Sequence, residues 1–497
     1  MLLKQERESK IRSFEELSAL GFFHLHSLGI QIDLNIAWRK ESAITARRAT
    51  LLPIREGHIC DHNCTIRSAT NPNGGGYACP AAYTLPENRG LDPKSLASLD
   101  DVLTGIHTVS AGLQSLRPQF FRRLKNLGYS QEIIDGIARG PSLPEINLFG
   151  GNPEMHPRIH EIIAQLIQEG YSVTLTTTGK RFLTSPEFVR RIKEHPPTKL
   201  ALSADDLPSD VDEIRRLAGL PQSELRKEYK KIPPTAGQKQ KAVEAISVLN
   251  LSYQDPKFPP IILNFVLHPE NIERAMEMMQ VLGELYSNAQ LNPYPAQSAF
   301  SGGPPILASD QLGTLEQIID GVIERHFTQL EGWVDFRVVP RLHYHLLLKA
   351  VFLAYPNDPQ KVSEILSGYG LWRCYGDPLL TARYIQIGAG EVQSLHPNLG
   401  MDGETQSPGG HPGCFWNPET VTNSKITVWD STPQQVRRHI TVGMQQLAEK
   451  PQHPCPGCGF PRLVFDEPSV IAGIPYAGVH NLVLTNYLTL RRKYGGF

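Results

Sequence analysis

The chain has 497 residues, which is long enough for two or three domains with hydrophobic cores of their own. Its 49 lysines and arginines nearly balance 50 aspartates and glutamates, and no basic cluster stands out, so the sequence does not favour a nucleic-acid-binding protein. A polar, charged first segment and the lack of an apolar run of about 18 residues argue against a signal peptide and a membrane span, so we expect a cytoplasmic protein.

Strands alternate with helices through the first 300 residues. A helix is expected from Ile159 to a C-cap at Gly170, another at about 238–250, and a third from Asn271 to about Tyr286. The expected strands are 50–56, 145–149, 172–178, 199–203, 261–267 and 289–292, the last of them stopped by Pro293. This alternation predicts parallel pairing with right-handed crossovers. Six strands favour an α/β fold of the partial (β/α)6, TIM-like barrel kind over a closed eight-stranded barrel.

Three cysteines follow the first predicted strand. Cys60 and Cys64 are spaced as CDHNC, and Cys79 comes after a segment rich in Gly, Asn and Ser. Thiolates are soft ligands that suit iron–sulfur clusters, and three of them leave one iron of a [4Fe–4S] cluster without a protein ligand. The alternative is that these cysteines are buried apolar thiols.

A glycine-rich turn and several polar residues lie where the later strands end. Such a turn brings bare backbone close to a small ligand, although it could also be only a tight turn before a helix. Ligands of parallel sheets bind at the carboxyl ends of the strands, but polar residues at strand ends also often have only structural hydrogen-bond partners. The turn is Gly150-Gly151-Asn152-Pro153, and the strand-end residues are Thr177, Ser203, Asn264 and Asn292.

Together, over roughly residues 48–295, these features resemble the radical S-adenosylmethionine (SAM) superfamily. CDHNC keeps the first spacing of the family's CxxxCxxC motif, whereas Cys79 departs from the second, and Gly-Gly-Asn-Pro resembles the family's Gly-Gly-Glu-Pro turn. The resemblance implies that a [4Fe–4S] cluster, reduced by a donor such as flavodoxin or ferredoxin, cleaves SAM to a 5′-deoxyadenosyl radical that abstracts a substrate hydrogen. It assigns Cys60, Cys64 and Cys79 to the cluster, and Gly150, Gly151, Asn152, Pro153, Ser203, Asn264 and Asn292 to SAM. Thr177 joins the expected SAM contacts because it lies at the carboxyl end of its strand.

Four further cysteines lie near the C-terminal end: Cys374, Cys414, Cys455 and Cys458. Cys455-Pro456-Gly457-Cys458 is a CxxC pair, and four cysteines complete a closed metal site. The arrangement resembles the SPASM/Twitch extensions of the same family and implies an auxiliary [4Fe–4S] cluster. A structural Zn²⁺ ion and unliganded thiols are the alternatives. The expected organisation is an extension at 1–46, the barrel at 47–300, bridging helices at 301–360 and a small cysteine-containing domain at 361–497.

The cysteine count bears on the reaction. Three cysteines on one cluster and four on another leave no thiol as a hydrogen donor, which favours an oxidative modification or cross-linking, with a peptide as substrate by analogy with the C-terminal extension. The alternatives are a radical SAM enzyme for a small molecule, such as an amino acid, nucleoside or cofactor precursor, and a zinc-stabilised β/α binding protein without enzymatic activity.

Overall fold

The computed structural model describes most of the chain from residue 98 to residue 361. The described residues are 98–115, 145–149, 152–204, 207, 210–233, 237–296, 307–328, 338–358 and 361, with single positions between 118 and 143 (118, 121, 122, 125, 131, 134, 135, 138 and 143) and between 432 and 438 (432–435, 437 and 438). Strand segments 31–35, 372–373, 384–388, 391–394, 426–427 and 462–463 are described by their backbone.

Among the described residues, including the outlying strand segments, nine strands form one sheet in the order β10-β9-β8-β1-β2-β3-β4-β5-β6. Strands β1 to β6 are parallel neighbours in chain order, β8 runs parallel to β1, and β9 and β10 are antiparallel additions at the far edge. Their bounds are β1 Gln31–Asn35, β2 Glu145–Phe149, β3 Ser172–Thr177, β4 Lys199–Ser203, β5 Ile261–Leu267, β6 Ala289–Pro295, β8 Tyr384–Gly388, β9 Glu391–Ser394 and β10 Ile426–Thr427. A separate antiparallel pair joins β7 (Trp372–Arg373) to β11 (Arg462–Leu463).

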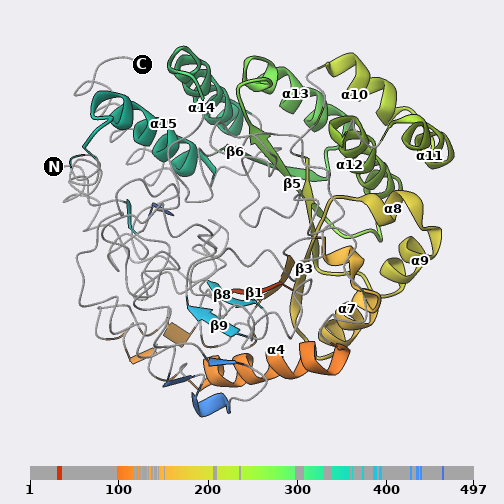
Figure 1. Cartoon of the computed structure of the whole chain (residues 1–497), viewed down its shortest axis with the longest axis vertical. Helices are drawn as coiled ribbons and strands as arrows, with labels where there is room; N and C mark the ends of the chain where they lie inside the picture. The colour runs from red at the N-terminus through yellow and green to blue at the C-terminus, as the bar shows by residue number, and fades with distance from the viewer. Residues whose placement is uncertain are drawn as a thin grey trace.

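The helices surround the curved sheet on its outer side, as Figure 1 shows for the arc from α4 to α14. Parallel strands that neighbour each other in chain order require crossovers that all step in one direction, which places their helices on one face. The sheet ends at β6 and β10, so it is an open, partial barrel, as the six-strand pattern predicts. The helices are α4 Leu99–Gln114, η4 Pro153–Met155, α7 Ile159–Gln168, α8 Lys180–Thr184, α9 Pro186–Glu194, α10 Val211–Ala218, α11 Gln222–Lys231, α12 Gly237–Gln254, η5 Ile272–Arg274, α13 Ala275–Leu285, η6 Ser309–Gln311, α14 Leu312–Thr328 and α15 Val338–Ala354.

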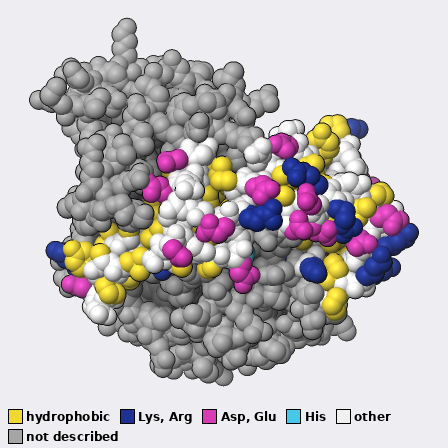
Figure 2. All heavy atoms as spheres, turned by 90° about the horizontal axis from the view of Figure 1, so that it is seen from above, with side chains coloured by type: hydrophobic (Ala, Val, Ile, Leu, Met, Phe, Trp, Pro, Cys, Tyr) yellow, Lys and Arg dark blue, Asp and Glu magenta, His cyan; other side chains and the backbone are white. Residues whose placement is uncertain are grey.

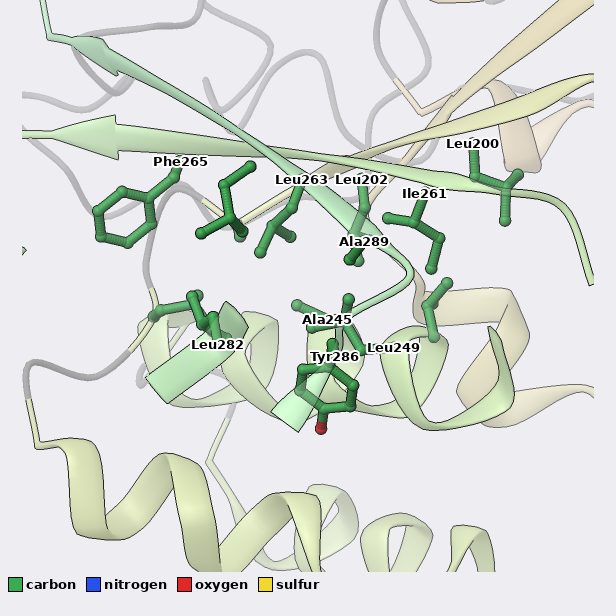
Figure 3. Packing of buried hydrophobic residues seen from close by; sticks show 14 of the residues in the cluster. Leu200, Leu202, Ala245, Leu249, Ile261, Leu263, Phe265, Leu282, Tyr286 and Ala289 are labelled. Carbon is green, nitrogen blue, oxygen red and sulfur yellow. The ribbon is translucent and has the colours of Figure 1, made fainter. Parts of the chain in front are cut away.

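The core lies between the outer face of the sheet and these helices. Alternate residues of β4 and β5, such as Leu202 and Leu263, are fully buried and point toward Ala245 and Leu249 of α12 and Leu282 of α13 (Figure 3). Burying one such leucine stabilises the fold by about 1.5–3 kcal/mol. A slip of one residue would turn this apolar row away from the helices, so the packing fixes the register of every strand.

Helix α7 follows the prediction closely. Its apolar stripe is buried at Ile159, Ile162, Ile163 and Leu166. Gly170 ends it with a positive φ of 89°, which residues with a Cβ adopt only with strain. The Gly170 N–H donates to the carbonyl of Ile167 at 3.0 Å, and the Tyr171 N–H to that of Leu166 at 2.9 Å, which is the Schellman pattern of helix ends.

Two predicted elements differ in the structure. Strand β6 continues through Pro293 to Pro295, because an edge strand tolerates a missing N–H donor on its open side. The place beside β2, which we expected for 50–56, is occupied by β1, a segment from the expected N-terminal extension; 50–56 itself lies outside the described residues. Both segments have strand-like apolar patterns, and local pattern alone does not choose a strand's partner. The domain division stays a prediction.

No helix in the described part of the chain combines the length and apolar character needed to cross a membrane.

Candidate functional site

A row of three polar residues crosses the carboxyl ends of β4, β5 and β6. Ser203 is the register partner of Asn264, and Asn264 is the register partner of Asn292. Register partners on parallel strands point to the same face, so the three side chains lie side by side on the face opposite the helices. All three are half-buried, and the Asn292 Nδ2 donates a 2.7 Å hydrogen bond to the Asn264 Oδ1. The structure thus brings together three of the residues expected at the ligand-binding edge.

Thr177 lies on the opposite face from this row. It pairs with Leu202, which points toward the helices, and its buried Oγ1 accepts a 2.9 Å hydrogen bond from the Gly179 N–H. Its neighbour Thr176 is on the polar face and donates from Oγ1 to the Asn147 Oδ1 of β2 at 3.2 Å. With three threonines in succession, the sequence does not show which of them faces the ligand side of the sheet, and Thr177 was expected there. In the structure, Thr176 and Asn147 continue the polar face formed by Ser203, Asn264 and Asn292.

The glycine turn is described from its third residue onward; Gly150 and Gly151 lie outside the described residues. Asn152 is 1% exposed and has an extended backbone, with φ of -114° and ψ of 99°. Pro153 begins the short 3-10 helix η4, where a residue without an N–H fits the first position. The turn therefore delivers a buried amide side chain close to the end of β2.

A buried carboxylate next to this turn was missed by the sequence analysis. Glu154 is 0% exposed, and its two carboxylate oxygens accept hydrogen bonds from the Gly179 N–H at 3.2 Å and the Arg181 N–H at 2.8 Å. The Arg181 guanidinium in turn donates to the main-chain carbonyls of Glu154 and His156 and lies over the Phe188 ring, 4.4 Å from its centroid. Burial lowers the pKa of Arg181, and the charge of Glu154 opposes that shift. The only sequence signal was an acidic residue directly after the turn.

Thr178 is a second missed residue. It is 8% exposed, and its Oγ1 has no hydrogen-bond partner among the described residues. Gly179 follows with a positive φ of 96°, and a Cβ added there would lie 2.6 Å from the carbonyl oxygen of Glu244 and 2.7 Å from the Val248 Cγ2. The loop after β3 is therefore packed against α12 and carries a buried hydroxyl at the carboxyl end of the sheet.

The expected metal ligands are the seven cysteines of the chain. Cys60, Cys64, Cys79, Cys374, Cys414, Cys455 and Cys458 all lie outside the described residues. Within the described residues, no group of three or more His, Cys, Asp and Glu side chains has the arrangement of a metal site. The cluster assignments remain predictions, whereas the polar row offers the hydroxyl and amide groups that a small polar ligand needs.

The described surface carries mixed charge. Figure 2 shows Lys/Arg and Asp/Glu side chains interspersed on the face in view. Ion pairs one helical turn apart, such as Arg216–Glu213 and Arg274–Glu277, occur on the helices of the described residues. Such surface pairs contribute little stability and give this face no single sign of charge to attract a polyanion.

No family model matches the chain, and no curated protein matches it. Solved structures that resemble it include two of Streptococcus suis SuiB, one of them bound to S-adenosylmethionine, each at 12% identity with a TM-score of 0.34 over 76% of this chain. A structure of TYW1 with a lysine-pyruvate adduct bound resembles it at 14% identity with a TM-score of 0.25, over 54% of this chain and 70% of that one. The chain covers 62% of the SuiB chain.

Proposed function

We propose that the chain is a radical SAM enzyme that binds SAM along the row Ser203, Asn264 and Asn292. The observation that carries the proposal is this row, because it lies at the carboxyl edge of an open parallel barrel whose second strand leads into Gly-Gly-Asn-Pro. Cys60, Cys64 and Cys79 would hold a [4Fe–4S] cluster. When reduced, that cluster supplies the electron that cleaves SAM to a 5′-deoxyadenosyl radical, which abstracts a substrate hydrogen.

The side chains of the row suit a ligand with both donors and acceptors. The Ser203 hydroxyl can donate and accept, and the Asn264 amide keeps its NH₂ donors while its oxygen accepts from Asn292. SAM carries a carboxylate, an ammonium group, ribose hydroxyls and an adenine, so its polar groups can be matched by such a set. The chain's own part is to bind and orient this cofactor, since the radical chemistry belongs to the cofactor itself.

The expected reaction is an oxidative modification or cross-linking of a peptide, in the cytoplasm, with a flavodoxin or ferredoxin as reductant. This expectation is supported by the number of cysteines. Three would bind one cluster, and Cys374, Cys414, Cys455 and Cys458 would bind an auxiliary [4Fe–4S] cluster of the SPASM/Twitch kind. No thiol would then be left to return a hydrogen atom to the substrate. Zinc at the four late cysteines is the alternative for that centre, and a small molecule is the alternative substrate.

The test uses full-length protein purified without oxygen. Iron and sulfide are measured first, and 5′-deoxyadenosine is then quantified after adding SAM and a strong reductant. We expect about eight irons per chain and 5′-deoxyadenosine release. Ser203→Ala and Asn264→Ala should weaken SAM binding, whereas Ser172→Ala, at the opposite end of β3, should leave it unchanged. A colourless protein without iron that does not cleave SAM would overturn the proposal in favour of a zinc-stabilised binding protein.

A further inference from the structure

The buried carboxylate of Glu154 joins two loops that follow neighbouring strands. It lies in η4, after β2, and its hydrogen-bond donors are the N–H groups of Gly179 and Arg181, after β3. A carboxylate this deeply buried is tolerated only where hydrogen bonds or charges compensate its lost hydration. Here two N–H groups fill that role, and the guanidinium of Arg181 returns to the carbonyl of Glu154 itself. The two segments are therefore tied in both directions.

This carboxylate also takes the place of a local helix cap. The N-cap of α8 is Gly179, which has no side chain to accept from the first N–H groups of the helix. An acceptor from 27 residues earlier in the chain, Glu154, meets the N–H of Arg181 instead. The start of α8 is thereby fixed to the segment after β2. Contacts that hold α8 in place therefore also hold that segment in place.

The hydrogen bonds of Glu154 connect a segment that is closely packed on α12 with residues near the expected ligand site. Gly179 packs so closely on α12 that an added Cβ would lie within 2.7 Å of Glu244 and Val248. Near the expected ligand site, Asn152 comes two residues before Glu154, and the buried Thr178 comes directly before Gly179. The Glu154 side chain therefore sets the position of Asn152 relative to Thr178 at the end of β3.

We propose that Glu154 is a positioning residue that fixes Asn152 and Pro153, the described end of the glycine turn, against the end of β3, so that Asn152 is held toward its ligand. That the ligand is SAM rests on the function proposed above; the tie between the two loops does not. Glu154 touches no reacting atom in this scheme and acts through the turn. Loss of the tie should therefore weaken ligand affinity, with little effect on the rate at saturating ligand.

The test compares Glu154→Gln with wild type and with Glu161→Gln in full-length protein. Glu161 is a matched control, since it is an acidic residue seven positions later that pairs with Arg158 at the surface. Hydrogen exchange without SAM should quicken both at 150–158 and at 179–184 in Glu154→Gln and at neither in Glu161→Gln. With SAM as the probe, the Kd of Glu154→Gln should rise about tenfold, while its 5′-deoxyadenosine rate at saturating SAM stays within about threefold of wild type.

Faster exchange confined to 179–184, with unchanged SAM affinity, would overturn the proposal and leave Glu154 as the cap of α8. If Glu154→Gln does not fold, Arg181→Met carries the test, because it removes the guanidinium bonds but keeps the main-chain N–H that Glu154 binds. It should raise the SAM Kd and quicken exchange at 150–158, and no change in either would count against the tie. A wild type that binds no SAM would refute the proposed function, while the exchange data would still decide whether the tie exists.

Discussion

The Asn292 Nδ2 of β6 donates to the Asn264 Oδ1 of β5 at 2.7 Å, across two parallel strands at one edge of the sheet. The two residues are register partners, so the bond lies along the row and not between the row and the core. It fixes the Asn264 amide with its oxygen toward β6 and its NH₂ group available to a ligand. Ser203, the register partner of Asn264 on β4, completes the row on the other side.

This bond predicts that the two asparagines act as a unit in ligand binding. In a double-mutant cycle of Asn264→Ala and Asn292→Ala, each single variant should weaken SAM affinity, and the double variant should lose less than the sum, by roughly 1 kcal/mol. Affinity is measured by equilibrium binding of SAM to the anaerobic protein. Gln290→Ala, two residues earlier on β6, serves as the control. Strict additivity would mean that the bond does not organise the site.

The buried hydroxyl of Thr178 predicts opposite effects on stability and on binding. Its Oγ1 has no hydrogen-bond partner among the described residues, and such a group costs about 1–3 kcal/mol when buried. Thr178→Val should therefore raise the free energy of unfolding by about 1 kcal/mol, measured with urea. If a bound ligand supplies the missing partner of the hydroxyl, the same variant should bind SAM more weakly. A variant that is more stable and binds SAM as tightly as wild type would show that the hydroxyl has no part in the site.

Alanine substitutions at Gly179 and Gly170 can be compared to test how closely the loop after β3 packs on α12. Both have positive φ, at 96° and 89°, so an alanine is strained at either position by roughly 1–2 kcal/mol. A Cβ at Gly170 meets its nearest atom, the Leu143 Cδ1, at 3.7 Å, whereas one at Gly179 would overlap the main chain of α12. Gly179→Ala should therefore destabilise by about 2 kcal/mol more than Gly170→Ala in chemical unfolding. Equal losses would contradict the close packing.

Much of the barrel follows from sequence pattern alone. Strands β2, β4 and β5 begin and end where expected, because each is a short apolar or alternating run bounded by turn residues. Strand β1 shows the limit, since 31–35 and 50–56 both suit a strand and only long-range pairing selects the neighbour of β2. Likewise, β6 includes Pro293 and Pro295 because it lies at an edge of the sheet, a position that cannot be predicted from local sequence.

The site was partly predictable for the same reason. Ser203, Asn264 and Asn292 each end or interrupt an apolar strand, so the alternation itself marks them as facing away from the core. In the run of threonines at the end of β3 that alternation is invisible, and the face of Thr176 appears only once the register is known. Glu154 was missed because an acidic residue after a turn is expected at the surface, and its partners come from 25 or more residues later.

The late cysteines predict how metal content responds to substitution. If Cys374, Cys414, Cys455 and Cys458 hold an auxiliary cluster, Cys455→Ser should lower the iron content by about four per chain and leave SAM cleavage detectable, because the cluster that binds SAM is untouched. Cys64→Ser should instead abolish 5′-deoxyadenosine release. Iron is measured together with zinc. An unchanged iron content with loss of one zinc would identify the late centre as structural zinc.

His160 predicts a loss of stability in mild acid. Burial, and then the charge of Arg191, lower the pKa of this histidine, and the Arg191 Nη1 lies 2.6 Å from its Nε2. The unfolded chain takes up a proton near pH 6.5, whereas the folded chain does so only at lower pH. The folded state thus binds fewer protons, and its stability falls as the pH drops below about 6.5.

His160→Gln keeps an acceptor for Arg191 and removes the titration. Its melting temperature should fall by about 1–2 °C less than that of wild type between pH 7.5 and 5.5. The exposed His195 is the control: His195→Gln should follow wild type, and a His160→Gln curve parallel to both would show that protonation of His160 does not affect folding.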